Sequence, residues 1–324
     1  MDRQPGPERA LAHGADAVRG RRVIVTGATS GIGFHTARGL AAAGAEVTLA
    51  VRSTDRGIRA ESAIRAEHPA AALRVDTLDL ADLSSIRTFA ARWLDEHGAG
   101  PDVLVNNAGI ISARRQVTRD GFETTIGTNH LGHFALTGLL IAGLSAAGDS
   151  STEHARVITV TSLAAHVGRL QVRTWTPEPR SRVLMPWTSY AQSKFANALF
   201  SVELQRRVIA AGLPIDSILV HPGFAVTNVL IPGLSTPGSA TTSSRIGALL
   251  GRRIVPSAEA AATCVRYAAG SPEVTGGMLV GPSGRFQIRG EPGILRLPGR
   301  AKDSRAGREL WQASERLTQV SYLD

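Results

Sequence analysis

A tyrosine and a lysine lie four residues apart in SYAQSKFANALF, residues 189–200. The chain has three tyrosines, and Lys194 and Lys302 are its only lysines, so the pairing is unusual for this composition. Residues i and i+4 of a helix project from one face, which would bring Tyr190 and Lys194 together. A nearby ammonium stabilises a phenolate and lowers the pKa of the phenol, so that it can donate and accept a proton near neutral pH. The pair therefore predicts acid–base chemistry.

A glycine-rich turn, TGATSGIG at residues 26–33, joins the apolar run RRVIVTG to a helical pattern. Small residues let the backbone approach a pyrophosphate, and the first turn of a helix offers it unpaired N–H groups. A tight turn without a ligand is the alternative, but strand, turn and helix follow in the order that a dinucleotide site requires. The residues predicted to hold the dinucleotide here are Gly27, Thr29, Ser30, Gly31, Ile32 and Gly33.

The end of the next strand-like run, AEVTLAVR, bears on the choice of cofactor. A carboxylate there would hold the ribose 2′-hydroxyl of NAD, whereas an arginine suits the 2′-phosphate of NADP. The run ends in Val51 and Arg52, which favours NADP(H) over NAD(H), and Arg56 is a second candidate contact. Asp79 and Leu80 follow the third run, and Asp79 is expected either to cap the next helix or to accept from the adenine amino group.

Apolar strand-like runs alternate with helical patterns along most of the chain. Seven such runs, separated by helices, predict the α/β class: a single-domain Rossmann fold with a doubly wound seven-stranded parallel sheet and helices on both faces. The fourth run ends in NNAG, which places Asn106, Ala108 and Gly109 beside the same crevice as the glycine turn.

The same patterns divide the chain into three parts. Residues 1–20 are predicted to be a flexible arm, 21–282 the NADP-binding and catalytic domain, and 283–324 a basic C-terminal extension with one helix near 304–318. Two stretches, 163–187 and 228–255, interrupt the alternation and are expected to shape a substrate pocket.

Composition narrows the classes of function. The net charge is +9, but the arginines are spread along the whole chain without a dense basic run, which favours a solvated surface over nucleic-acid binding. Cys264 is the only cysteine, so an intramolecular disulfide and a cysteine zinc site are excluded. The apolar run FALTGLLIAGL is too short to span a bilayer, and no leader pattern begins the chain. We therefore expect no membrane span and a cytoplasmic location.

Two histidine patterns could suggest other chemistry. His130 and His133 are spaced i, i+3 as metal ligands can be, but no third ligand follows at a suitable spacing, so helix packing is favoured and no metal is expected. His166 follows the segment ITVTS, and His221 begins the segment HPGFAVT; both are expected to orient loops.

Six motifs occur in an order that resembles the short-chain dehydrogenase/reductase family. They are TGATSGIG, NNAG, TNHLGHF, ITVTS, YAQSK and HPGFAVT, and the resemblance covers residues 21–281. TNHLGHF, TSLAAHVGRL and SYAQSKFANALF further resemble the retinol dehydrogenase-like branch, which includes the WW-domain oxidoreductases.

The resemblance implies a role for each matching residue. Tyr190 would be the general acid and base, Lys194 would lower its pKa and bind the nicotinamide ribose, and Ser162 would polarise the substrate oxygen. Asn129 would hold a water that links Lys194 to solvent. Pro222, Gly223 and Thr227 in HPGFAVT would line the nicotinamide side of the site.

The resulting prediction is an NADP(H)-dependent enzyme that interconverts a lipophilic alcohol and its aldehyde or ketone. The alternatives are a catalytically silent, nucleotide-sensing binding protein of the same fold and a polyketide-type ketoreductase. Light-driven pigment reduction is disfavoured because Cys264 is not placed to match that branch. The partners expected are a small lipophilic substrate and, through the helices near 121–146 and 188–212, a second copy of the chain.

Overall fold

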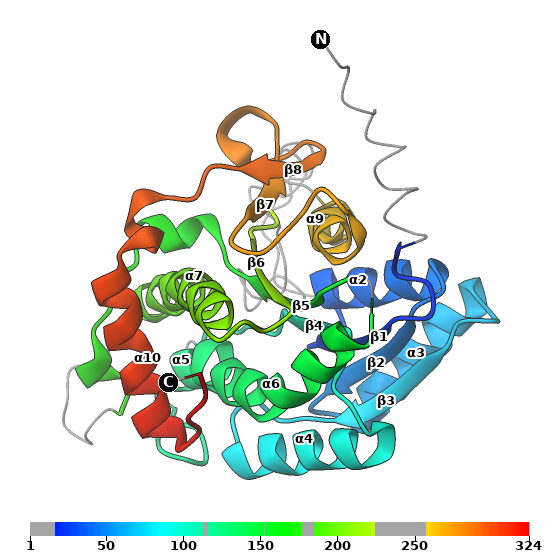
Figure 1. Cartoon of the computed structure of the whole chain (residues 1–324), viewed down its shortest axis with the longest axis horizontal. Coiled ribbons are helices and arrows are strands. Elements are labelled where there is room, and N and C mark those ends of the chain that lie inside the picture. Colours follow the sequence, from blue (N-terminus) through cyan, green and yellow to red (C-terminus); the bar gives the residue numbers. More distant parts are fainter. Residues whose placement is uncertain (1–16, 113–115, 152, 177–184, 224–256, 324) are drawn as a thin grey trace, which may run out of the picture.

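A single twisted sheet of eight strands forms the centre of the computed structural model, which describes residues 17–112, 116–151, 153–176, 185–223 and 257–323 (Figure 1). The strand order is β3-β2-β1-β4-β5-β6-β7-β8. The strands are β1 Arg22–Thr26, β2 Glu46–Val51, β3 Leu73–Thr77, β4 Val103–Asn106, β5 Ala155–Val160, β6 Ile215–Val220, β7 Leu279–Pro282 and β8 Pro292–Leu295.

The predicted doubly wound sheet is confirmed, with one strand more than the sequence suggested. β1 to β7 are parallel, as predicted, whereas β8 pairs antiparallel with β7. A parallel neighbour needs a long crossover connection, but an antiparallel one needs only a short return. The nine residues between Pro282 and Pro292 make that return, so the edge of the sheet is built from the segment predicted to be an extension.

Helices cover both faces of the sheet (Figure 1). Alternate residues of each buried strand face opposite layers, so Ile24 joins one apolar core and Val25 the other. The first core lies under α4, α6, α7 and α10, and the second under α2, α3 and α9. The helices are α2 Gly31–Ala42, α3 Thr54–Glu67, α4 Leu83–His97, α5 Thr124–Ile126, α6 Gly132–Asp149, α7 Pro186–Ala210, α9 Ala258–Gly270 and α10 Ser304–Thr318.

The helix expected near 121–146 contains a π-helical turn, Gly127–Leu131, between α5 and α6. Together these elements run from Thr124 to Asp149, which is long and apolar enough to cross a membrane by length and composition. The run FALTGLLIAGL, which was predicted to be too short for a span, is therefore only part of a longer apolar helix. In this fold 67% of the most apolar window is buried, as in a core helix of a globular protein, so the run is weak evidence for a span.

The C-terminal segment packs on the helices of the preceding part of the fold. α10 begins and ends as predicted and lies against α7 and α6, where the Trp311 ring is fully buried. The Arg207 guanidinium lies 4.5 Å from the centre of that ring, and the Tyr322 hydroxyl donates to the Phe134 carbonyl at 3.2 Å. The predicted basic extension is thus part of the fold. It also covers part of the two long helices that were expected to contact a second copy.

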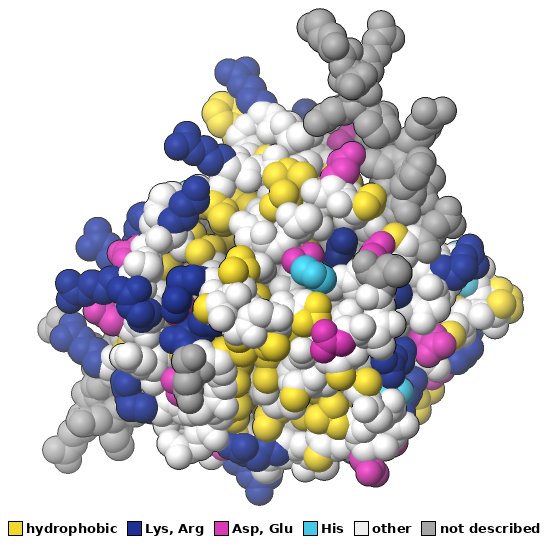
Figure 2. Space-filling model, in the orientation of Figure 1, with side chains coloured by type: hydrophobic (Ala, Val, Ile, Leu, Met, Phe, Trp, Pro, Cys, Tyr) yellow, Lys and Arg dark blue, Asp and Glu magenta, His cyan; other side chains and the backbone are white. Residues whose placement is uncertain are grey.

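Basic side chains are scattered over the visible surface with acidic ones among them, and they are densest along the side where α10 lies (Figure 2). Arg305, Arg308 and Arg316 of that helix are exposed, and the Arg305 guanidinium donates to the Glu309 carboxylate at 3.0 Å. Their distribution agrees with a solvated helix face.

Candidate active site

A cavity of about 870 Å³ opens at the carboxyl ends of the parallel strands. It lies at the ends of β1 and β4, where the strand order reverses: the chain runs outward from β1 to β2 and β3 and then crosses back to β4 on the other side of β1. A doubly wound sheet forms its ligand crevice at such a point. The predicted residues that line it are Gly27, Thr29, Ser30, Gly31, Ile32, Gly33, Arg52, Asp79, Leu80, Ala108, Gly109, Ser162, Tyr190, Lys194, Pro222 and Gly223. Thr227 and the stretch 228–255 lie outside the described residues.

The glycine turn forms one wall of the cavity and leaves no room for larger residues. Gly27 has a φ of +68°, and a Cβ there would lie 2.9 Å from the Ala108 Cα. A Cβ on Gly33 would lie 2.5 Å from the Asn107 Nδ2. The Ser30 side chain makes no capping bond at the start of α2, so the first-turn N–H groups remain available to a ligand. A cradle of this shape fits the pyrophosphate of a dinucleotide.

Arg52 and Arg56 lie at the end of the cavity beyond β2. Both line it and are exposed, and among the described residues neither guanidinium has a hydrogen-bond or ion-pair partner. Asp79 does not cap α4. Asp82 is the capping residue, and its carboxylate accepts from the Ser84 and Ser85 N–H groups. The Asp79 carboxylate accepts from the Ala81 N–H at 2.9 Å and lines the cavity.

The expectation for Asn106 requires a correction. Its side chain is 0% exposed and donates to the Thr137 hydroxyl on α6 at 3.0 Å, away from the cavity. Asn107 lines the cavity instead, and its side chain donates to the Thr26 carbonyl at 2.7 Å. Successive residues of a strand face opposite sides, so the alternation of the run VLVNN could have made this distinction.

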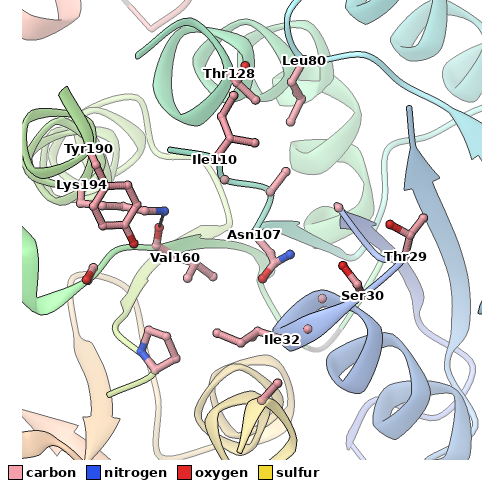
Figure 3. Close-up of a pocket in the computed structure, with 18 of the residues that line it drawn as sticks. Thr29, Ser30, Ile32, Leu80, Asn107, Ile110, Thr128, Val160, Tyr190 and Lys194 are labelled. Carbon is pink, nitrogen blue, oxygen red and sulfur yellow. Dashed lines mark hydrogen bonds between the residues drawn. The ribbon is translucent and has the colours of Figure 1, made fainter. Parts of the chain in front are cut away.

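Tyr190 and Lys194 lie side by side on α7 and face the glycine turn across the cavity (Figure 3). Lys194 is 3% exposed; its Nζ donates to the Val160 carbonyl at 3.0 Å and lies 5.8 Å from the centre of the Tyr190 ring. Burial lowers the pKa of Lys194 to about 8. The amine is therefore mostly protonated near neutral pH and loses its charge just above it.

Ser162 completes this wall from the end of β5. Burial raises the pKa of Tyr190, and a hydrogen bond with the Ser162 hydroxyl opposes that rise. The Ala164 N–H donates to the Ser162 Oγ at 3.2 Å, which holds the serine at the start of a short 3-10 turn, Leu163–His166. A hydroxyl, a phenol and an ammonium therefore meet at one place in the cavity.

Asn129 lies behind this wall, in the π-helical turn. Its side-chain oxygen accepts from the Ile110 N–H at 2.8 Å, and its Nδ2 donates to the Ile110 carbonyl and the Ser193 hydroxyl, both at 3.0 Å. Both amide protons are used within the protein, so Asn129 clamps the loop after β4 to α7. Its predicted role in holding a water stays a prediction.

The region around Tyr190 is apolar. Ile110, Leu163, Val167 and Trp187 line it, and the Trp187 ring lies 5.6 Å from the Tyr190 ring. Three of these residues belong to the predicted stretch 163–187. Ile110 was not predicted, although it directly follows NNAG.

The two suspected loop-orienting histidines can now be placed. The Gly223 N–H donates to the His221 Nδ1 at 3.2 Å, so the Nε2–H donates to Gln287 at 3.1 Å and ties the loop after β6 to the segment before β8. His166 is exposed, and its Nδ1 lies 3.0 Å from the Leu163 carbonyl. His130 and His133 each bond to protein partners, and no cluster of metal-ligating residues occurs within the described ranges.

The comparisons with known proteins agree with this arrangement. Residues 21–176 match the family model described as short chain dehydrogenase. Polyprenol dehydrogenase of Mus musculus is 39% identical over 92% of this chain and 84% of its own length, and retinol dehydrogenase 13 of Homo sapiens is 36% identical over 93% and 85%.

Among solved structures, an uncharacterized protein from Mycobacterium Paratuberculosis superposes with a TM-score of 0.74 at 39% identity, covering 95% of this chain and 98% of that one. Family matches of this extent imply a nicotinamide cofactor and oxidation or reduction at a CH–OH group. The chain belongs to the short-chain dehydrogenase family, in its retinol dehydrogenase-like branch.

Proposed function

We propose that the protein interconverts a lipophilic alcohol and its aldehyde or ketone with NADP(H), with Tyr190 as the acid and base. The observation that carries this proposal is the meeting of Ser162, Tyr190 and Lys194 on one wall of the cavity, opposite the glycine turn. The bound nicotinamide would supply or accept the hydride. The chain itself would hold the substrate and move the proton.

Each of the three side chains has a distinct task in the proposed reaction. The Ser162 hydroxyl donates to the substrate oxygen and stabilises the charge that develops there. The Tyr190 phenol gives a proton to that oxygen in reduction and removes one in oxidation. The Lys194 ammonium stabilises the phenolate electrostatically, and it can do so only in its protonated form.

The preference for NADP(H) is supported by Arg52 and Arg56. Their exposed guanidinium groups line the end of the cavity next to β2, where an adenine ribose would lie in this fold. The neighbouring lining residues Val51 and Ser53 carry no carboxylate that would repel a 2′-phosphate. A guanidinium can bind a phosphate through two parallel hydrogen bonds.

A lipophilic substrate is supported by the apolar side chains of Ile110, Leu163, Val167 and Trp187 next to Tyr190. The related proteins are named for polyprenol and retinol, which are both long apolar alcohols. Short polar substrates would leave this part of the cavity without favourable contacts.

The test is NADPH consumption against a panel of aliphatic, isoprenoid and β-keto thioester carbonyl compounds, with Tyr190→Phe as the variant. Tyr267→Phe is the matched control, because its hydroxyl bonds to Glu273 and does not line the cavity. Tyr190→Phe should lose nearly all turnover while still binding NADPH. Unchanged turnover in this variant would refute the assigned acid, and tight NADPH binding without turnover of any compound would favour a nucleotide-sensing protein.

The cytoplasmic location and the self-association predicted from the sequence stay predictions. Cell fractionation in the native host and sedimentation of the purified protein would test them separately.

A further inference from the structure

A buried histidine outside the proposed catalytic set lies between the glycine turn and the wall formed by Ser162, Tyr190 and Lys194, which we call the catalytic wall. His133, the second residue of α6, is 1% exposed and does not line the cavity. Its Nδ1 lies 3.0 Å from the Asn129 carbonyl oxygen, and its Nε2 lies 2.9 Å from the Thr26 hydroxyl at the end of β1. One ring therefore joins two elements that hold opposite sides of the site.

The partners determine where the protons lie. A carbonyl oxygen can only accept, so the Nδ1 of His133 must carry the hydrogen. Burial lowers the pKa of His133 to about 4, helped by the charge of Lys194 and opposed by the bond to Asn129, so the ring is neutral near neutral pH. Its Nε2 then has only a lone pair, and the Thr26 hydroxyl must donate to it rather than to its other possible acceptor, the Val105 carbonyl at 3.2 Å.

The oriented Thr26 hydroxyl fixes the beginning of the loop after β4. Its oxygen accepts from the Asn107 and Ala108 N–H groups, both at 2.9 Å. A hydroxyl has one donor and two acceptor positions, so all of its hydrogen-bonding capacity is used. The Asn129 side chain holds the other end of the same loop at the Ile110 backbone.

We propose that His133 is a positioning residue, which fixes residues 107–110 between the cofactor cradle and the catalytic wall by joining Thr26 to Asn129. This inference rests on the proposed function. The loop lies against the acid–base pair: a Cβ on Gly109 would be 3.4 Å from the Lys194 Nζ. Asn129 in turn donates to Ser193, whose hydroxyl donates to the Tyr190 carbonyl at 2.8 Å, so the network continues into α7.

The first test is spectroscopic and needs neither cofactor nor substrate. In protein labelled with ¹⁵N-histidine, the resonance that disappears in His133→Gln should show a neutral ring with the proton on Nδ1 and should stay neutral until the pH falls to about 4. A ring protonated on Nε2, or a ring charged near neutral pH, would overturn the proposal.

The second test compares substitutions that keep different halves of the bridge. The amide of His133→Asn can replace the Nδ1 bond to Asn129, the longer His133→Gln can reach Thr26, and His133→Leu keeps neither. His133→Leu should bind NADPH more weakly and lose on the order of 100-fold in kcat, the scale of a displacement of about 1 Å among catalytic groups. Asn and Gln should each restore part of the loss.

A neighbouring histidine provides the matched control. His130 is equally buried on the preceding turn, but its Nε2 faces the Ser314 hydroxyl of α10 instead of the site. His130→Leu should lower the melting temperature as His133→Leu does, while NADPH affinity and kcat stay near the wild-type values. If the two leucine variants lose only stability and to the same degree, His133 is a packing residue and the proposal fails.

A double-mutant cycle tests the route through Thr26. Thr26→Val should reproduce the loss of His133→Leu, Thr26→Ser should largely rescue it, and the double variant should lose little more than either single one, because both changes break the same bridge. Additive losses would overturn the proposed route. If the wild type turns over no substrate, the proposed function fails, but the NADPH affinities and the histidine spectra still decide on His133.

Discussion

Replacing Lys194 with methionine should slow alcohol oxidation by an amount that depends on pH. The Lys194 Nζ lies 5.8 Å from the centre of the Tyr190 ring. Taking that separation with an effective dielectric constant of about 20, the attraction between ammonium and phenolate is about 3 kcal/mol. That energy corresponds to a phenol pKa about two units lower than without the charge, since one unit is about 1.4 kcal/mol.

The sign of the pH dependence follows from the pKa of Lys194, which burial lowers to about 8. Below that pH the wild type has its ammonium and the variant does not, so oxidation by the variant should be about 100-fold slower. Above that pH the wild type progressively loses its ammonium while phenolate continues to form in the variant. The ratio of the two rates should therefore fall as the pH rises and approach one about two units higher.

The assay is the initial rate of NADP⁺ reduction with the best alcohol of the substrate panel, at saturating cofactor, across this pH range. Saturation removes any effect of Lys194 on cofactor affinity. Lys302→Met is the control because Lys302, the other lysine, is exposed and does not line the cavity. A rate ratio that stays constant from neutral pH upward would show that the charge of Lys194 does not act through the phenol.

Three further substitutions test other parts of the structure. Arg52→Ala should weaken NADPH binding on the order of 10- to 100-fold with little effect on NADH, as loss of charge-assisted bonds to a phosphate would; the exposed Arg59→Ala is the control, and equal effects on both cofactors would refute the phosphate contact. Gly33→Ala should reduce the affinity for NADPH and for NADH, because the added Cβ would lie 2.5 Å from the Gly27 carbonyl oxygen. Wild-type affinities in cofactor-binding titrations of this variant would contradict this. Trp311→Ala should cost about 3–5 kcal/mol in urea unfolding, whereas the exposed Arg308→Ala should change stability by less than about 0.5 kcal/mol. Similar midpoints for these two variants would show that α10 contributes little to the core.

The seven parallel strands and most of the cavity could be predicted because their signals are local. A strand buried on both faces is a continuous apolar run, and a phosphate cradle needs small residues at the point where such a run meets a helix. β8 could not be predicted in this way. It is four residues long, begins with proline and pairs with β7 through an antiparallel return.

Other features depend on contacts that no local pattern contains. The π-helical turn leaves the apolar pattern of a long helix nearly unchanged, yet it contains Asn129, whose side chain bonds to Ile110 and Ser193. The hydrogen bond between His133 and Thr26 joins residues 107 positions apart in the chain. The spacing of His130 and His133 could exclude a metal only for want of a third ligand, and it gave no indication that Thr26 or Ser314 would be the partners.

The position of α10 has a consequence for how the protein is made. Phe134 and Phe200 pack against each other and against Trp311, so this aromatic cluster joins two central helices to a helix that is made more than 100 residues later. Domains begin to fold from the N-terminal side during synthesis, but these two rings lack their contact with Trp311 until α10 has left the ribosome. A nascent chain stalled before α10 should therefore expose an aggregation-prone aromatic surface after the residues of the active site have already been made. We expect chaperone binding to matter most at this stage.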